Sequence, residues 1–228
     1  MDKIDSKILL ELLKDSRAPI SLIAKKTKLS REVVGYRMEK YVSGGIIKEF
    51  FTQINTVKLG YTSALLFLSL KNDAEEELIK YMKSSEFISW AGKQCGKWSI
   101  GMAIYGKNMV EVQKIFEEII NKFQNSIQSH LFEFYKNMEF FYEKYFNSHV
   151  LLSSYKNKFE LVYTIDDYDK KILKLLSKNS RISCIEISKY VPISSVAISQ
   201  RIKNLEKSKY ILSYSIYISP SKIGLYQF

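Results

Sequence analysis

The first sixty residues place apolar side chains at the spacing of α-helices. Between residues 2 and 17 they fall on one helical face, at Ile4, Ile8, Leu9, Leu12 and Leu13. Residues 20–28 predict a second, shorter helix, and residues 30–41 predict a third, whose core stripe is Val34, Met38 and Tyr41. Gly44 and Gly45 end that helix, and a β-rich stretch follows over residues 46–54. Three helices followed by a β wing predict a winged helix-turn-helix.

Residues 2–60 return without a gap as residues 166–224, at a constant offset of 164. Such a repeat indicates two modules of one fold. The recurring residues are Asp5/Asp169, Lys7/Lys171, Ile8/Ile172, Leu9/Leu173, Leu12/Leu176, Ser16/Ser180, Arg17/Arg181, Ile23/Ile187, Ser30/Ser194, Arg37/Arg201, Ile47/Ile211, Ile54/Ile218, Lys58/Lys222 and Gly60/Gly224. We call residues 2–60 copy one and residues 166–224 copy two.

Capping residues mark where the repeated helices begin and end. Asp2 caps the first helix, with Asp5 three residues later, and Asp166 with Asp169 repeats the arrangement. Ser30 and Ser194 are expected to cap the third helices. Pro192 forces the second helix of copy two to stop at Val191. Ser208 and Lys209 replace the two glycines of copy one, which leaves the end of the third helix of copy two open.

The middle of the chain follows a different pattern. Strands are predicted over residues 62–70, 87–95, 98–106 and 127–135, and helices over 74–85 and 108–123. Their order is βαββαβ. We therefore predict an α+β protein with four parts, namely a winged helix-turn-helix over residues 1–60, a βαββαβ domain over 61–146, a linker over 147–163 and a second winged helix-turn-helix over 164–228.

The excess positive charge lies in the repeated modules. Residues 1–60 hold 12 Lys or Arg and 7 Asp or Glu, residues 164–228 hold 11 and 5, and the middle holds 12 of each, giving +5, +6 and 0 of the total +11. A Lys-rich composition alone would charge the middle segment as well. The distribution therefore indicates modules that dock on a polyanion, foremost a nucleic acid.

Composition excludes several other classes of protein. No apolar run reaches the length of a membrane span and no basic leader precedes an apolar stretch, so we expect a cytoplasmic protein that does not enter a membrane. Cys95 and Cys184 have no nearby Cys or His partners, so we expect two buried thiols, with no metal site. His130 lies in an apolar strand pattern and is expected in the core, whereas His149 falls in a stretch without a clear pattern.

Copy one resembles the DNA-binding domain of the leucine-responsive/AsnC (feast/famine) transcription regulators. The residues that carry the resemblance are Asp5, Ile8, Leu9, Arg17, Ile23, Ala24, Leu29, Ser30, Val34, Arg37, Gly45 and Ile47. Copy two matches at Asp169, Ile172, Leu173, Arg181, Ile187, Ile193, Ser194, Ile198, Arg201 and Leu205. The resemblance implies that the middle segment is a ferredoxin-like domain of the RAM or ACT type, which dimerises and often binds an amino acid.

The resemblance also implies an effector site and an assembly. Ligand contacts in the family gather at the glycine-containing turn of the middle strand pair, here Gly96, Trp98 and Ser99, although a Trp beside a hairpin glycine is also a common packing residue. Ser99 stands where an acidic residue is usual. Pairing of middle domains would give a homodimer with four DNA-binding modules. No other cofactor is expected.

A helix fits the major groove of DNA and presents exposed residues to base edges, while Lys and Arg around it neutralise phosphates. The two copies differ at the exposed positions of the third helix, so we expect two different half-sites. For base reading we predict Arg31, Glu32, Tyr36, Ser195, Ser199 and Gln200. For phosphate contact we predict Lys25, Lys28, Ser30, Arg37, Lys40, Lys189, Ser194, Arg201 and Lys203. Arg37 and Arg201 could equally brace their modules by pairing with an acidic residue.

The main hypothesis is a sequence-specific regulator that is not an enzyme, and two alternatives stay open. Proteins with the same pair of domains decarboxylate sirohaem, but they carry Arg- and His-rich signatures after the wing, which residues 52–64 lack. An architectural protein with little base readout is the second alternative. Copy two reaches residue 224 and the chain ends at 228 without a second βαββαβ pattern, so we expect either a shortened form of a double-length regulator or two reading modules with one assembly domain.

Overall fold

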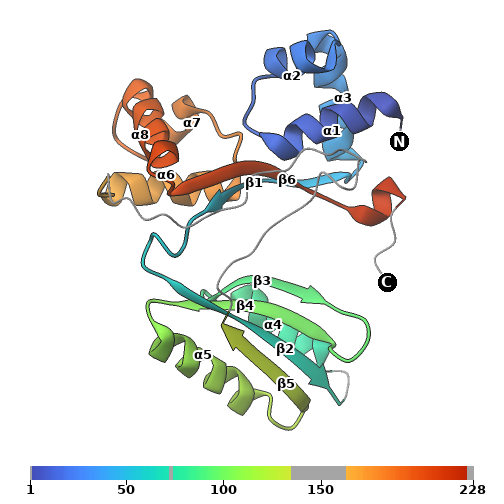
Figure 1. Cartoon of the computed structure of the whole chain (residues 1–228), viewed down its shortest axis with the longest axis vertical. Helices are drawn as coiled ribbons and strands as arrows, with labels where there is room; N and C mark the ends of the chain where they lie inside the picture. The colour runs from blue at the N-terminus through green and yellow to red at the C-terminus, as the bar shows by residue number, and fades with distance from the viewer. Residues whose placement is uncertain (1, 72–73, 135–162, 225–228) are drawn as a thin grey trace. The chain divides into compact units, whose positions relative to one another are not determined.

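The computed structural model describes residues 2–71, 74–134 and 163–224 (Figure 1). These residues form two compact units. The first, which we call the reading unit, holds residues up to Asn55 together with those from Tyr163 onward. The second holds residues 56–134. The linker predicted over 147–163 and the end of the predicted βαββαβ domain, residues 135–146, lie almost wholly outside the described residues. The domain boundaries drawn from the sequence stay predictions.

Copy one has the three helices and the strand that its pattern predicts. The Asp2 carboxylate caps the first helix by accepting from the Asp5 amide at 2.7 Å, and the Asp5 carboxylate accepts from the Asp2 amide at 2.9 Å. Ser30 caps the third helix through the amide of Val33. The elements are α1 (Lys3–Lys14), α2 (Ile20–Thr27), α3 (Arg31–Ser43) and β1 (Ile47–Ile54).

Copy two repeats this arrangement with one shorter helix. The helix expected to stop at Val191 already ends at Ser188, because Lys189 is its C-cap and residues 189–193 turn. The third helix, whose end the sequence left open, finishes at Lys207. The elements are α6 (Asp167–Lys178), α7 (Cys184–Ser188), α8 (Ser195–Lys207), β6 (Ile211–Ile218) and a short 3-10 turn η2 (Pro220–Ile223).

The wing strands of the two copies pair with each other. β1 and β6 form an antiparallel two-stranded sheet in which Phe51 lies opposite Ser215, its own counterpart in the repeat. Phe50 pairs with Ile216 and Thr52 with Tyr214. Tyr214 is the counterpart of Phe50 in the repeat and Ile216 is the counterpart of Thr52, so exchanging the two copies turns one pair into the other. The register is therefore that of a pseudo-two-fold axis through the centre of the ribbon. Figure 1 shows α1–α3 toward one end of this ribbon and α6–α8 toward the other.

Each strand also completes the core of the other copy. α1 packs on β6 and α6 packs on β1. Ile216 of copy two, 2% exposed, belongs to the hydrophobic core formed by α1, α2 and α3. The Ser215 hydroxyl donates to the Leu13 carbonyl at 3.0 Å, and the Thr52 hydroxyl donates to the Leu176 carbonyl at 2.7 Å. The two copies thus fold as one body.

A pair of arginines closes the interface near the pseudo-two-fold axis. The hydroxyls of Ser16 and Ser180, both fully buried, lie 2.6 Å apart. Nη1 of Arg17 donates to the carbonyls of Ser180 and Ile182, at 2.6 and 2.8 Å. Nη1 of Arg181 donates reciprocally to the carbonyls of copy one, to Ser16 at 2.5 Å and to Ala18 at 3.1 Å. These guanidinium groups satisfy carbonyls of the loops that join the first and second helices of each copy.

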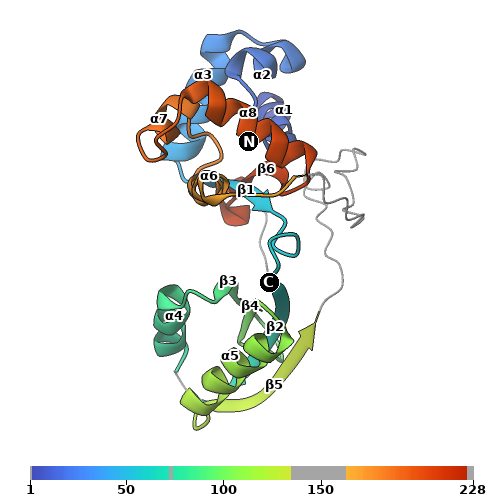
Figure 2. The same cartoon turned by 90° about the vertical axis from the view of Figure 1, so that its left-hand side faces the viewer.

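The second unit is the ferredoxin-like domain that the middle pattern predicts. Its four antiparallel strands lie in the order β3-β4-β2-β5. Two helices pack on the sheet and bury Leu66, Leu78, Met102 and Ile119 among others (Figures 1 and 2). The elements are β2 (Thr62–Leu70), α4 (Glu75–Ser84), β3 (Ile88–Lys93), β4 (Ile100–Gly106), α5 (Met109–Lys122) and β5 (Ile127–Phe134).

Candidate nucleic-acid interface

α2 and α3 form a helix-turn-helix in copy one. Ile23, Ala24, Val34 and Met38 are buried where the two helices meet the core. The turn between them passes through Lys28, whose φ of 58° is left-handed. Burial of one stripe of α3 leaves its opposite face exposed, as a helix that docks in a groove requires.

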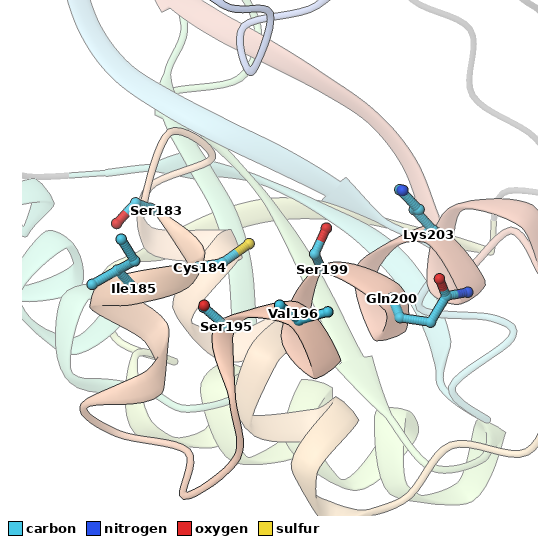
Figure 3. A pocket seen from close by; sticks show the side chains of 8 residues that line it. All are labelled: Ser183, Cys184, Ile185, Ser195, Val196, Ser199, Gln200 and Lys203. Carbon is cyan, nitrogen blue, oxygen red and sulfur yellow. The ribbon is translucent and has the colours of Figure 1, made fainter.

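α7 and α8 repeat the motif in copy two. Ser194 caps α8 through the Ala197 amide, and Ile198, Ile202 and Leu205 form its buried stripe. The start of α7 with its N-cap, and one face of α8 from Ser195 to Lys203, border a groove of about 460 Å³ (Figure 3). Its lining residues are Ser183, Cys184, Ile185, Ser195, Val196, Ser199, Gln200 and Lys203.

The six residues predicted to read bases all lie on α3 or α8, at or beside these outer faces. Tyr36 is 57% exposed, and the Lys40 ammonium lies 4.8 Å from the centre of its ring. The pKa of Glu32 is lowered by hydrogen bonds from its own amide and from the Ser30 hydroxyl, so its carboxylate is ionised at neutral pH. The Gln200 amide donates to Asn204 at 3.1 Å. Base reading by these six residues stays a prediction.

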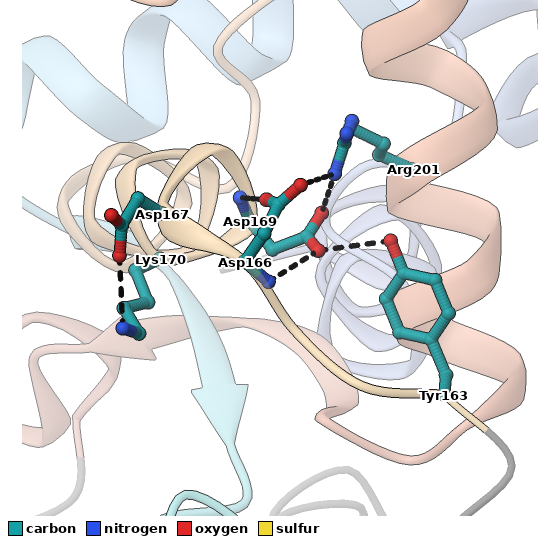
Figure 4. A network of polar contacts seen from close by, with 6 residues as sticks. All are labelled: Tyr163, Asp166, Asp167, Asp169, Lys170 and Arg201. Carbon is teal, nitrogen blue, oxygen red and sulfur yellow. Dashed lines mark hydrogen bonds and ion pairs between the residues drawn. The ribbon is translucent and has the colours of Figure 1, made fainter.

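The structure gives Arg37 and Arg201 the bracing role. Arg37 pairs with Asp2 at 2.9 Å and with Asp5 at 2.7 Å. Arg201 makes the same bonds to Asp166 and Asp169, at 2.9 and 3.0 Å (Figure 4). Hydrogen bonds to these aspartates raise the pKa of both guanidinium groups. Each arginine therefore joins the start of its module's first helix to its recognition helix.

In each copy one of the two bracing aspartates also accepts from a tyrosine, and the two copies obtain that tyrosine differently. In copy one the Tyr41 hydroxyl on α3 donates to Asp5 at 2.7 Å. In copy two the Tyr163 hydroxyl, which precedes α6, donates to Asp169 at 2.9 Å. Burial raises the pKa of both tyrosines, and the neighbouring carboxylate raises it further. Leu205 stands at the position of Tyr41 in copy two, so the repeat alone does not predict Tyr163.

The remaining residues predicted to contact phosphate surround the recognition helices. Lys25, Lys28, Lys40 and Lys203 are exposed. Lys189 is also exposed and forms an ion pair of 2.7 Å with Glu186, which raises the pKa of its ammonium. Ser30 and Ser194 occupy the N-caps that the sequence predicts. Phosphate contact by these side chains stays a prediction.

Two exposed apolar residues of the interface are not among those that the sequence predicted to read bases or contact phosphates. Val196 on α8 is 77% exposed, and Ile185 on α7 is 70% exposed. Both line the groove of Figure 3. The repeat contained the signal for Val196, because it aligns this residue with Glu32, on the outer face of α3.

In the turn expected to hold an effector, Ser99 is engaged in internal hydrogen bonds. The Ser99 hydroxyl accepts from the Leu70 amide at 3.2 Å, and the Ser99 amide donates to the Leu68 carbonyl at 2.8 Å. Trp98 lies beside Phe67, with ring centres 6.4 Å apart. Gly96 has a φ of 108°, a backbone conformation that residues other than glycine rarely adopt. An amino-acid effector here stays a prediction, whereas the packing role for Trp98 is observed.

Three expectations about single residues were wrong. Cys95 is exposed and Cys184 is only half-buried, because Cys95 lies in the turn after β3 and Cys184 begins the short helix α7 at the groove. His130 is exposed and makes a T-shaped ring contact with Phe116, because its strand lies at the edge of the sheet.

Among the described residues there is no cluster of three potential metal ligands and no helix long and apolar enough to cross a membrane.

Two helix-turn-helix modules with exposed recognition helices define the class of protein, a winged helix-turn-helix protein. Family models agree with this class. Residues 1–41 match the AsnC-type helix-turn-helix domain, and residues 165–211 match a winged helix-turn-helix DNA-binding model. The transcriptional regulator LrpC of Bacillus subtilis is 30% identical over 123 residues, which cover 54% of this chain and 83% of LrpC. The chain belongs to the Lrp/AsnC family.

Other comparisons differ in how much of each protein they cover. The transcriptional regulator LrpA of Pyrococcus horikoshii is 45% identical over 60 residues, so the match spans 26% of this chain and less than half, 43%, of that relative. The solved structure of LrpC aligns with 61% of this chain over 97% of the LrpC chain, with a TM-score of 0.52 and 26% identity. The sirohaem decarboxylase NirDL covers 94% of this chain and 66% of its own, with a TM-score of 0.61, but at 16% identity that likeness shows the fold alone.

Proposed function

We propose that this protein is a sequence-specific, double-stranded DNA-binding transcription regulator whose single reading unit carries two recognition helices. The observation that carries the proposal is the pairing of β1 with β6, which makes one body of the two modules. Many helix-turn-helix proteins need a dimer to present two recognition helices to two half-sites. In this chain one polypeptide supplies both helices.

Charge and family support a nucleic-acid partner. The two modules hold net charges of +5 and +6, and the middle segment holds none in excess. Lysines surround both recognition helices, as expected for phosphate neutralisation. The curated relatives LrpA and LrpC are both named transcriptional regulators. The reading faces differ chemically, since Arg31, Glu32 and Tyr36 correspond to Ser195, Val196 and Gln200.

Competition binding at fixed salt tests this function. The full chain is bound to a fluorescent duplex obtained by selection from random DNA, and unlabelled selected or unrelated duplex is added. A specific regulator binds its selected site about 10³-fold or more tightly than unrelated DNA. A ratio near one would favour the architectural alternative. The variant Lys203→Ala should weaken binding to both competitors equally, since a phosphate contact carries no sequence information.

An enzymatic function is tested on the same preparation. The extent of the likeness to NirDL motivates the test, because that structure covers 94% of this chain. The chain has two histidines, and His130 is the one that the structure describes. We expect purified protein incubated with an iron tetrapyrrole to show no new haem-type absorption band after gel filtration. A stoichiometric band would contradict the assignment as a regulator without enzymatic activity.

A further inference from the structure

The two reading faces of the unit differ at two apolar positions of copy two. In copy two the groove between α7 and α8 presents Ile185 and Val196, with exposures of 70% and 77%. Figure 3 shows Ile185 on α7, with Ser195 and Val196 on the first turn of α8 across from it. The repeat aligns Ile185 with Ser21 and Val196 with Glu32. Copy one is therefore polar where copy two is apolar.

Charge separates the two faces in the same way. The outer face of α3 carries the carboxylates of Glu32 and Glu39. At the aligned positions α8 carries Val196 and Lys203, and none of the residues that line the groove is acidic. A surface that combines apolar side chains with positive charge suits a polyanion whose edge includes apolar groups. A protein partner of ordinary surface chemistry would not require the lysine.

The major groove of DNA contains one apolar group that a side chain can contact, the C5-methyl group of thymine. Valine and isoleucine side chains are suited to cover it. Gln200 lies one turn beyond Val196 on α8, and glutamine pairs with adenine through one N–H and its carbonyl oxygen. The Gln200 bond to Asn204 uses one of two amide hydrogens, so both groups needed for adenine are available.

We infer that copy two reads an A·T-containing half-site through thymine methyl groups contacted by Val196 and Ile185, with Gln200 on a neighbouring adenine. Copy one lacks these apolar contacts and reads its half-site through polar ones. Arg31 suits guanine, and the ionised Glu32 suits the amino group of cytosine. This inference rests on the proposed function, and it predicts an operator with two chemically different halves.

Replacing single thymines by deoxyuridine tests the inference directly, because it removes the methyl group and keeps the hydrogen-bonding edge. Each thymine of a selected operator is replaced in turn, and binding of the full-length protein is measured by fluorescence anisotropy. We expect the sensitive thymines to lie in one half only, and replacement of each to lower the protein's affinity for the duplex about fourfold, which is the effect of burying one methyl group. Replacements in the other half should leave affinity unchanged.

Variants show whether Val196 makes the contact. In Val196→Ala the affected thymine should become insensitive to replacement, whereas in Val110→Ala it should keep its full effect. Val110 is the matched control, since it is 66% exposed on α5, outside the reading unit. Glu32→Ala should keep the thymine effect and relax a preference in the other half. Circular dichroism should show both valine variants folded, because neither side chain is buried.

The outcomes separate the inference from the function on which it rests. If a two-part operator is selected but no thymine is sensitive, or if the sensitivity is equal in Val196→Ala, the inference is overturned and the proposed function stands. Loss of self-association in Val196→Ala without any thymine effect would also overturn it, in favour of a protein contact. Failure to enrich any sequence overturns both.

Discussion

At the residue scale, the carboxylates that cap the first helices make the fold sensitive to acid. The pKa of Asp2 and of Asp166 is held below its usual range, chiefly by the amide of the residue three positions later and next by Arg37 or Arg201. A carboxyl group whose pKa is lower in the folded chain stabilises the fold in its ionised form. That stabilisation is complete above the unfolded pKa of about 3.9 and is lost as the pH falls through the folded value.

We therefore expect the free energy of unfolding to be constant above about pH 5 and to fall below about pH 4. Urea unfolding between pH 2.5 and 6 measures it. Asp166→Asn keeps an N-cap side chain but does not titrate, so its acid limb should be shallower than that of the wild type. An acid limb of equal slope in Asp166→Asn would contradict the assignment. Asp167→Asn is the control, since Asp167 is an exposed neighbour paired with Lys170.

Lys209 holds a backbone conformation that its counterpart adopts more easily. Gly45 has a φ of 69° and Lys209 a φ of 61°, both left-handed, just after the ends of α3 and α8. A side chain in this region costs about 1–2 kcal/mol, part of which is offset by the greater freedom of an unfolded glycine. Lys209→Gly should stabilise the reading unit by about 0.5–1 kcal/mol in urea unfolding. The mirror variant Gly45→Lys should destabilise it, and an unchanged midpoint in both would refute the strain.

Sequence reasoning succeeded at residues whose role depends on near neighbours. The capping pairs of Asp2 with Asp5 and of Asp166 with Asp169 follow from spacing alone, and both are confirmed. Prediction from near neighbours fails at Lys209. Replacement of Gly45 by a lysine in the repeat left the end of α8 open, but the conformation is the same, because the module's packing imposes it against the residue's own preference.

At the element scale, the strand exchange makes each module depend on the other. Ile216 on β6 is buried in the core of copy one, whereas its neighbour Tyr217 points outward and is 49% exposed. The hydrophobic core of copy one therefore includes a side chain more than 160 residues away in sequence. The β-rich pattern of residues 46–54 and 210–218 predicts the two strands but not their partner, because alternation specifies a face and carries no record of the neighbouring strand.

Ile216→Ala tests this dependence. Truncating a buried isoleucine costs about 2–5 kcal/mol. We expect that loss in the free energy of unfolding of the reading unit, together with faster amide hydrogen exchange in α1 and α3 of copy one. Tyr217→Ala is the matched control on the same strand and should have a much smaller effect. If exchange in α1 and α3 stayed at the wild-type rate in Ile216→Ala, the shared core would be contradicted.

At the scale of the whole molecule, the duplication produces one asymmetric reading unit. The pseudo-two-fold symmetry of the backbone is close, since the ribbon register and the Arg17 and Arg181 contacts repeat in both directions. The side chains presented to a ligand break that symmetry. This departure could be predicted in part, because aligning the copies reveals the differing residues on α3 and α8. Their union in one body could not be predicted, because it depends on the pairing of β1 with β6.

We propose that one chain reads two different half-sites with α3 and α8. The test is selection of bound duplexes from random DNA, performed with the wild type and with Arg31→Ala and Gln200→Ala. Both side chains project from outer faces, so the variants should fold normally. We expect a wild-type operator with two unlike halves, and loss of preference in one half for Arg31→Ala and in the other for Gln200→Ala. A perfectly palindromic operator, or the same half weakened by both variants, would contradict the account.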